Sequence, residues 1–284
     1  MIPSAFDYEV AGSIDQAISL VKDGGEDAKL LAGGHSLLPL MRLRLARPSL
    51  LIDIGRLSDL SYIREDRDRI AIGALTRHHD LEYSELLDRQ CPIVAHTAAG
   101  IGDPQVRHRG TIGGSVAHGD PASDFPTVLL ALDAELVVRG DGAERTIGAS
   151  EFFTGLFETA MKPDEILTEI RVPKLDAKKH AWSYQKFHRR AQDWAIVGVA
   201  AVLERSNGGI GNAAIGLTNM GATPLRATAT ESALVGAKRD DVAAAAEKAG
   251  DDTNPPADTN GSADYRKHLA RVLTRRAVEE ALNR

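Results

Sequence analysis

Apolar and polar positions at the beginning of the chain follow a pattern that predicts a small strand–helix unit. Residues 13–16 have the form of a capping box, and apolar residues recur behind them at helical spacing, which predicts a helix over residues 14–24. Short apolar runs predict strands at residues 29–31 and 50–54, with a short helix at residues 37–43 between them. This β-loop-α-β order is typical of a nucleotide-holding subdomain.

The middle of the chain shows hairpin and helix patterns in turn. The predicted elements are a hairpin over residues 60–74, a helical region over residues 81–99, a helix over residues 127–132 and strands at residues 135–138 and 166–172. Between the last two strands, Asp141-Gly142 predicts a hairpin turn.

A polar stretch at residues 173–179 predicts a domain boundary. Beyond it, the turn residues 206–209 predict a hairpin between two apolar segments, residues 195–203 and 213–217. The remaining patterns predict an alanine-rich helix over residues 239–249, a flexible stretch over residues 251–261 and an amphipathic helix over residues 263–282.

The pattern as a whole predicts an α+β protein of two domains. The first covers residues 1–176, divided into subdomains at about residues 1–55 and 56–176, and the second covers residues 177–284. No repeat of solenoid period is visible.

Composition narrows the function classes. The net charge is −6 and aromatic residues make up 5% of the chain, which argues against a nucleic-acid-binding protein. The N-terminus lacks the pattern of a signal peptide, and no apolar run reaches membrane-spanning length. We therefore expect a cytoplasmic protein with no membrane insertion.

Cysteine and histidine usage predicts no metal site in this chain. The single cysteine, Cys91, excludes an internal disulfide and a Cys-ligated iron–sulfur cluster, and its apolar neighbours predict a buried, inert thiol. The nine histidines show no zinc-binding spacing. His78, His79, His108 and His118 could cluster in space, but scattered hydrogen-bonding histidines are the better expectation.

Two glycine-doublet segments carry the strongest chemical signal. They are Ala32-Gly33-Gly34-His35-Ser36, the first motif, and Thr111-Ile112-Gly113-Gly114-Ser115, the second motif. A Gly-Gly pair allows positive φ and a close approach of ligand to backbone, and successive amide groups there form a nest for an anion. Each segment alone is as well explained by a tight turn, whereas the pair predicts two nests that grip the two phosphates of one dinucleotide.

A third glycine segment matches the sequence of the Rossmann dinucleotide-binding fingerprint but not its structural context. Residues 209–214 fit the relaxed form G-x-G-x-x-A, but that motif must join a strand to a helix. Here the segment lies between two strand-like stretches, which predicts a hairpin instead.

The residues around the two motifs resemble a known family. The segments AGGHSLLPLMRLRLARPSLLIDIGRL, GDPQVRHRGTIGGSVAHGDPASDFP and GSADYRKHLARVLTRRA are similar to FAD-binding subunits of molybdenum hydroxylases, most of all to the medium subunits of aerobic carbon monoxide dehydrogenases. The resemblance covers essentially the whole chain. It implies a vanillyl-alcohol-oxidase or PCMH-type FAD-binding domain of two subdomains, followed by a smaller α+β domain.

The resemblance also implies a set of FAD-binding residues and no catalytic residue. The two motifs would hold the pyrophosphate through backbone amides and the Ser36 and Thr111 hydroxyls, although the family usually has asparagine where this chain has Ser115. The full implied set is Ala32, Gly33, Gly34, His35, Ser36, Leu37, Thr111, Ile112, Gly113, Gly114, Ser115, Asp124, Lys186 and Trp194.

Three of these residues have structural alternatives. Asp124 would accept a ribose hydroxyl, or it opens a helix and is stabilised by the helix dipole. Lys186 would stabilise negative charge on reduced flavin, or it is a solvated surface lysine. Trp194 would cover one face of the isoalloxazine, or it anchors the second core, in which case Tyr184 could take its place.

By the same resemblance, the chain is an electron-transfer subunit. A large subunit with a molybdopterin cofactor would oxidise CO or another substrate, and a small subunit with [2Fe–2S] clusters would pass electrons to FAD in this chain. The resemblance also implies that the three subunits assemble as a dimer of heterotrimers. The electrons would leave to a quinone or another acceptor, and the complex could lie at the inner face of the membrane. Two alternatives are a self-contained FAD-dependent reductase on the same scaffold and a non-enzymatic nucleotide-binding module.

Overall fold

The structure, a computed structural model, describes residues 2–206 and 208–284. The N-terminal part is a parallel three-stranded sheet in the order β1-β3-β2, formed by β1 (Asp7–Val10), β2 (Ala28–Leu31) and β3 (Leu50–Asp53). Helix α1 (Ile14–Gly24) begins at Ser13, whose Oγ accepts a hydrogen bond from the amide of Gln16 at 3.1 Å. The capping-box prediction is therefore confirmed, whereas β1 was not predicted.

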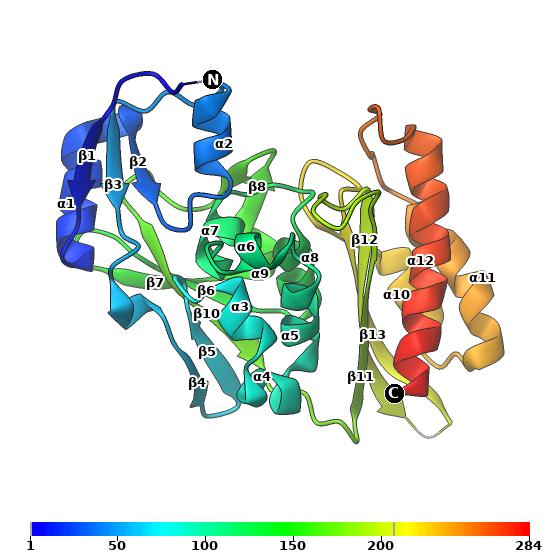
Figure 1. The fold of residues 1–284 in the computed structure, drawn as a ribbon. Helices are drawn as coiled ribbons and strands as arrows, with labels where there is room; N and C mark the ends of the chain where they lie inside the picture. Colours follow the sequence, from blue (N-terminus) through cyan, green and yellow to red (C-terminus); the bar gives the residue numbers. More distant parts are fainter. Residues whose placement is uncertain (1, 207) are drawn as a thin grey trace.

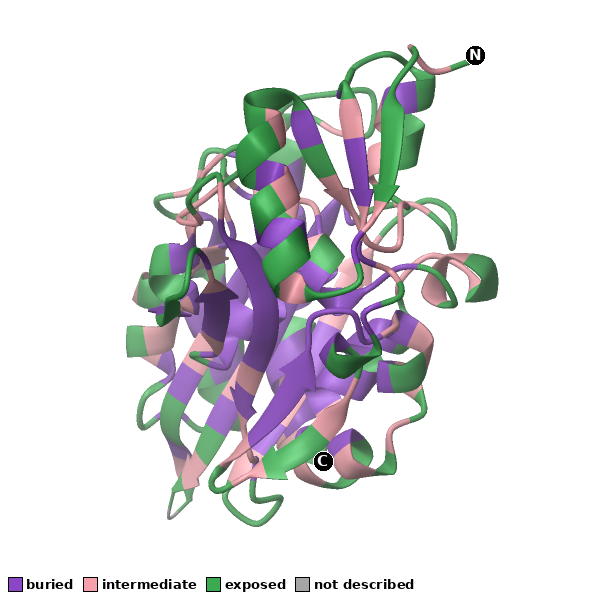
Figure 2. Ribbon diagram, turned by 90° about the vertical axis from the view of Figure 1, so that its left-hand side faces the viewer, coloured by how far each residue is buried: buried purple, intermediate pink, exposed green. Residues whose placement is uncertain are grey.

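A five-stranded sheet in the order β4-β5-β10-β6-β7 forms the middle of the molecule. Its strands are β4 (Ile63–Asp66), β5 (Arg69–Gly73), β6 (Glu135–Arg139), β7 (Glu144–Gly148) and β10 (Ile166–Pro173). Both predicted hairpins are present, β4 with β5 and β6 with β7. Buried residues are concentrated in its central strands (Figure 2).

Helix α2 (Leu37–Arg42) connects β2 to β3 in the N-terminal part. The helices between β5 and β10 are α3 (His78–Glu82), α4 (Glu85–Gln90), α5 (Pro92–Ala99), α6 (Pro104–Arg107), α7 (Ile112–Ala117), α8 (Asp124–Ala131) and α9 (Ala149–Phe152). The helical region predicted over residues 81–99 is present, divided among α3, α4 and α5. Ser84 caps a new helix there, and Pro92 starts another because its fixed φ suits a first turn.

The C-terminal part is an antiparallel sheet in the order β11-β12-β13-β14. Its strands are β11 (His180–Phe187), β12 (Val197–Ser206), β13 (Gly209–Thr218) and β14 (Leu225–Arg226). The predicted β12–β13 hairpin is confirmed, and Asn207 of its turn lies outside the described residues. Residues 209–214 therefore belong to a strand, not to a dinucleotide fingerprint.

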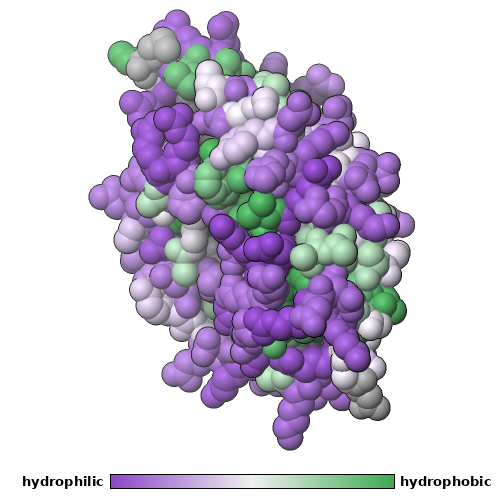
Figure 3. Space-filling view, turned by 90° about the vertical axis from the view of Figure 1, so that its right-hand side faces the viewer, coloured by the Kyte–Doolittle hydropathy of each residue, from purple (hydrophilic) through white to green (hydrophobic). Residues whose placement is uncertain are grey.

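Two helix layers cover the two faces of this sheet (Figure 1). Helices α5 and α8 lie on one face, and α10 (Thr228–Leu234) and α12 (Ala263–Asn283) lie on the other. The outer face seen in Figure 3 is mostly hydrophilic with small separate apolar areas. The remaining elements are α11 (Val242–Ala246), β8 (Phe153–Gly155), β9 (Glu158–Thr159) and the 3-10 turns Gly25–Asp27, Ser58–Leu60, Arg239–Asp241 and Glu247–Gly250.

The largest hydrophobic core crosses the predicted domain boundary. It contains Phe125, Phe152 and Ile170 from the first part together with Tyr184 of β11 and Ala200 of β12. Across the part of the chain that the structure describes, no helix combines the length and the apolar character needed to cross a bilayer.

Candidate functional site

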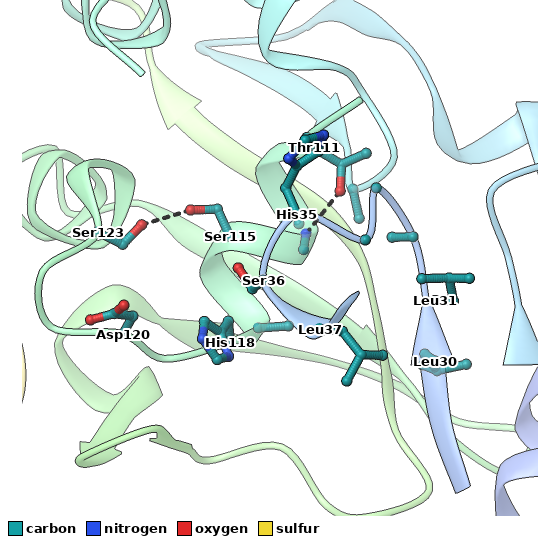
Figure 4. A pocket seen from close by; sticks show the side chains of 18 of the residues that line it. Leu30, Leu31, His35, Ser36, Leu37, Thr111, Ser115, His118, Asp120 and Ser123 are labelled. Carbon is teal, nitrogen blue, oxygen red and sulfur yellow. Dashed lines mark hydrogen bonds between the residues drawn. The ribbon is translucent and has the colours of Figure 1, made fainter. Parts of the chain in front are cut away.

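The two glycine motifs line one cavity of about 420 Å³. Figure 4 shows His35 and Ser36 of the first motif close to Thr111 and Ser115 of the second. Of the predicted site residues, the cavity wall contains Ala32, Gly33, Gly34, His35, Ser36, Leu37, Thr111, Gly113, Gly114, Ser115, Asp124 and Trp194. Ile112 and Lys186 are not in that wall.

The first motif is in direct backbone contact with the approach to the second. A Cβ placed on Gly33 would overlap the carbonyl oxygen of Arg109 and would lie 2.9 Å from the Cα of Gly110. The side chain of Arg77 holds the same Arg109 carbonyl with a short hydrogen bond. Gly33 is therefore required for close packing of two segments that are far apart in the sequence.

The first motif has the geometry of an anion nest. It leaves β2 and enters α2, and Gly34 has a φ of 76°. Among the described residues, the amide groups of Gly33, Gly34, His35 and Ser36 have no hydrogen-bond acceptor. These four N–H groups at the cavity can donate hydrogen bonds to an anionic ligand.

The second motif is not the open loop that its glycines predicted. Thr111 caps α7, and its Oγ1 accepts a hydrogen bond from the amide of Gly114 at 3.1 Å. The amides of Ile112, Gly113 and Ser115 donate to backbone carbonyls at 2.8 to 3.1 Å, so these amides and that of Gly114 are already used within the protein. Of the five amides of this motif, that of Thr111 has no acceptor among the described residues. Binding of phosphate by this motif stays a prediction.

The glycines of the second motif serve close packing. A Cβ on Gly113 would lie 2.5 Å from Cβ and from the carbonyl oxygen of Ala74, so only glycine fits against the end of β5. Gly114 is exposed to the cavity. What this motif offers a ligand is its open glycine surface and the Thr111 and Ser115 hydroxyls.

A buried ion pair stands beside the cavity. Asp124, the first residue of α8, accepts from Lys186 Nζ at 2.8 Å on Oδ2 and from the Tyr184 hydroxyl at 2.6 Å on Oδ1. The Lys186 side chain is only 8% exposed, so its alternative as a solvated lysine is wrong. Burial, and then Asp124, raises the pKa of Tyr184 well above its usual range, which keeps the phenol as a donor.

Trp194 and Tyr184 have separate places. Trp194 is 63% exposed and lies in the cavity wall, so its alternative as a core anchor is wrong. Tyr184 is buried against the core and is absent from the described wall. The loop that carries Trp194 also sends Gln192 to Asp103 in a short hydrogen bond, which ties β11 and its following loop to the first part of the chain.

Three neutral imidazoles face the cavity. Burial lowers the pKa values of His35 and His118, and it lowers the pKa of His78 to about 3. His79 and His108 stack outside the wall at 4.0 Å between ring centroids. No group of three potential metal ligands occurs in residues 2–206 and 208–284. Cys91 is buried, as predicted, and burial raises the pKa of its thiol to about 12, which disfavours the reactive thiolate.

Sequence reasoning missed His78 and Asp120 as cavity residues. Both lie in the cavity wall, and both are buried. Asp120 stands in the polar stretch that follows the second motif, and this position is the signal that could have identified it. His78 carried no such signal, because its place depends on β5 and on the contact with Gly110.

Two family models together match most of the chain. Residues 4–175 match the FAD binding domain in molybdopterin dehydrogenase, and residues 182–281 match the CO dehydrogenase flavoprotein C-terminal domain. The Hydrogenophaga pseudoflava carbon monoxide dehydrogenase medium chain is 42% identical over 283 residues, 99% of this chain and 98% of that one. The 6-hydroxypseudooxynicotine dehydrogenase complex subunit alpha of Paenarthrobacter nicotinovorans is 41% identical, over 100% of this chain and 97% of its own.

Solved structures show the same fold. A carbon monoxide dehydrogenase structure from Hydrogenophaga pseudoflava, lacking the Mo-pyranopterin moiety of its molybdenum cofactor, matches with a TM-score of 0.97 at 43% identity, covering 100% of this chain and 99% of that one. Quinoline 2-oxidoreductase from Pseudomonas putida 86 matches with a TM-score of 0.94 at 30% identity, covering 100% of this chain and 99% of that one. The predicted fold class, FAD-binding domain and oxidoreductase class are thus confirmed, and this chain belongs to the family of FAD-binding medium subunits of molybdopterin dehydrogenases.

Proposed function

We propose that the cavity between the two motifs holds FAD. The observation that supports this most directly is that both motifs line the same cavity, and that Gly33 of the first motif packs against Arg109 and Gly110, which lead into the second motif. The free amides of the first motif would take the diphosphate, and Ser36, Thr111 and Ser115 would add hydroxyl donors. The break between the family models supports domains of residues 1–176 and 177–284. The separate sheet of β1, β2 and β3, whose last strand ends at Asp53, supports a subdivision of the first domain at about residue 55.

The residues present fit a flavin dinucleotide. Neutral imidazoles and unused amides suit an anionic diphosphate without a buried cation, and the apolar wall formed by Leu30, Leu31 and Ile101 suits an aromatic ring. When bound, FAD supplies exchange between one-electron and two-electron partners. Trp194 would exclude water from the ring, and the Asp124–Lys186 pair would fix the wall behind it.

We infer that this subunit transfers electrons within a complex. A small subunit with [2Fe–2S] clusters would deliver them, a large subunit with the molybdenum cofactor would oxidise the substrate, and a quinone would remove the electrons. The lone cysteine supports this division, because this chain cannot ligate such clusters itself. We place the complex in the cytoplasm as a dimer of heterotrimers.

Carbon monoxide is the substrate that we propose for the complex. The relatives at 42% identity are carbon monoxide dehydrogenase medium chains, and the family model that matches residues 182–281 is the CO dehydrogenase flavoprotein C-terminal domain. A subunit of a nicotine-derivative dehydrogenase is 41% identical, so this chain by itself carries little information on the substrate. The large subunit determines that chemistry.

Purification from the native cell under mild conditions tests the proposal. We expect a flavin absorption spectrum, stoichiometric FAD after extraction, and two co-purifying subunits that contain molybdenum and iron. The complex should reduce a quinone analogue with CO and not with an N-heterocycle. A flavin-free complex would contradict the cavity assignment, and an active chain purified without partners would favour a self-contained reductase.

A further inference from the structure

A second carboxylate, Asp120, lies at the cavity with one of its two oxygens unpaired among the described residues. Asp120 is 9% exposed and lies in the cavity wall. Its Oδ1 accepts from the amide of Ala122 at 2.8 Å, whereas Oδ2 has no donor or cation among the described residues. Burial lowers the pKa of the neighbouring His118, although the Asp120 carboxylate acts in the opposite direction, so burial favours the neutral form of this imidazole.

The turn that carries Asp120 is fixed from two sides. The amide of Ser123 donates to the Asp120 carbonyl at 3.0 Å, and the Ser123 hydroxyl lies 2.7 Å from that of Ser115, the last residue of the second motif. From the other domain, the amide of Asn219 donates to the Pro121 carbonyl at 2.8 Å. Asp120 is therefore a pre-positioned side chain in the cavity wall that also contains the two motifs (Figure 4).

Chemistry restricts what Asp120 can bind. A carboxylate repels a phosphate, so the unused oxygen must face a neutral hydrogen-bond donor of the ligand. In FAD the diphosphate is bonded on one side to the ribityl chain and on the other to the adenosine ribose. The groups that adjoin a bound diphosphate therefore carry hydroxyls, which are donors that a carboxylate accepts strongly.

Asp124, the aspartate that the family resemblance indicated for this role, is less available. Both of its oxygens already accept from charged or buried donors, Lys186 and the Tyr184 hydroxyl. Asp124 thus joins α8 to β11, whereas Asp120 keeps an oxygen open to the cavity.

We propose that Asp120 is the carboxylate that accepts hydrogen bonds from sugar hydroxyls of FAD, either on the ribityl chain or on the adenosine ribose. The proposal rests on the proposed FAD site. Asp120 is a binding residue that orients the cofactor. Asp124 is a positioning residue that holds α8 and β11 together beside the cavity through Lys186 and Tyr184.

The test compares Asp120→Asn with Asp59→Asn, an exposed residue outside the cavity. Asparagine keeps the Oδ1 acceptor for Ala122 but removes the charge on the free oxygen. FAD affinity is measured by titration of the flavin-depleted full complex. We expect about a tenfold or greater rise in Kd for Asp120→Asn, because a hydrogen bond to a charged acceptor is lost, and no change for Asp59→Asn.

Two FAD analogues separate the possible hydroxyl sources. One lacks the hydroxyls of its adenosine ribose, and the other lacks those of its ribityl chain. The analogue that lacks the hydroxyls bound by Asp120 should have the same Kd for wild type and for Asp120→Asn. The analogue that keeps those hydroxyls should still bind wild type more tightly than Asp120→Asn. Unchanged FAD affinity in Asp120→Asn, or full discrimination with both analogues, would overturn the proposal. If wild type itself fails to bind FAD, the proposed function fails instead.

Discussion

Gly33 shows how one missing side chain joins two distant segments. Its α-hydrogens face the backbone of Arg109 and Gly110, where no Cβ fits. We expect Gly33→Val to reduce the flavin content of the purified protein strongly, because the branched side chain separates the two motifs. Overpacking of this kind also costs about 1–3 kcal/mol of folding free energy. Flavin-to-protein ratio and thermal unfolding measure both effects.

Gly148→Val is the matched control for that substitution. Gly148 has an ordinary φ of −66°, and its Cβ would meet only Ser150 Oγ at 3.7 Å. This variant should retain its flavin. Equal flavin content in both variants would show that contact between the motifs is not needed for binding.

His78 makes the fold sensitive to acid. Burial lowers its pKa from 6.5 to about 3, so the folded state resists the proton that the unfolded chain takes up. Below pH 6.5 the unfolded state binds more protons, and the free energy of unfolding therefore falls as the pH drops toward 3. The loss reaches about 1.4 kcal/mol for each pH unit within that window.

The variant His78→Phe tests this contribution. In wild type, the ring centroids of His78 and Phe125 are 5.5 Å apart and the rings are stacked. A phenylalanine at position 78 keeps a ring against Phe125 but cannot take up a proton. Denaturant unfolding at several pH values should show a shallower acid dependence than in wild type. The exposed His188→Gln should leave the dependence unchanged. Parallel curves for wild type and His78→Phe would contradict the assignment.

At the scale of elements, the Asp124–Lys186 pair fastens β11 to α8. The two side chains are 5% and 8% exposed, and the Tyr184 hydroxyl completes the network. We expect Lys186→Met to cost about 3–5 kcal/mol of folding free energy, since it leaves a buried carboxylate without a cation. Urea unfolding measures this loss.

A double variant separates charge from packing in that network. Adding Asp124→Asn to Lys186→Met removes the uncompensated charge and should restore part of the stability. Lys22→Met, which removes a surface pair with Asp141, should have little effect. A double variant that is less stable than Lys186→Met would contradict the buried-charge explanation.

Elements that local signals define were predicted well from the sequence. The capping box at Ser13, the turn at Asp141-Gly142 and the long final helix each depend on neighbouring residues alone. Strand β11 was missed because its polar Ser183 is buried through a contact with Glu280 of α12, which no local pattern reveals. The second motif was predicted as a loop because its glycines suggested positive φ, whereas Gly113 is needed for contact with Ala74.

The candidate site was predicted in part for the same reason. The first motif and its small residues are a local signal, and the structure brings them to the cavity. The partners of Asp124 and the place of His78 depend on contacts between distant elements. Such contacts are set by tertiary packing, which the amino-acid pattern of one segment does not contain.

At the scale of the whole molecule, the two predicted domains share a core. The sheet β11–β14 is covered on one face by α5 and α8, which belong to the first domain (Figure 1). We expect residues 1–176 expressed alone to aggregate, because the apolar face of these helices would be exposed to water. Size-exclusion chromatography measures this.

Co-expression with residues 177–284 is the control for the fragment. The two pieces should associate and recover soluble protein, because their shared face is buried again. A soluble, monomeric fragment of residues 1–176 with a cooperative unfolding transition would show that the first domain folds independently.

The backbone contact between Gly33 and Arg109 has a consequence for ligand affinity. Folding itself brings the first motif against the residues that lead into the second motif. Ligand binding then does not have to close these two segments on each other, and it loses little conformational entropy. For the FAD that we propose, such preorganisation favours tight binding. Substitutions that loosen the contact between Gly33 and Arg109 would therefore weaken FAD binding without touching the ligand.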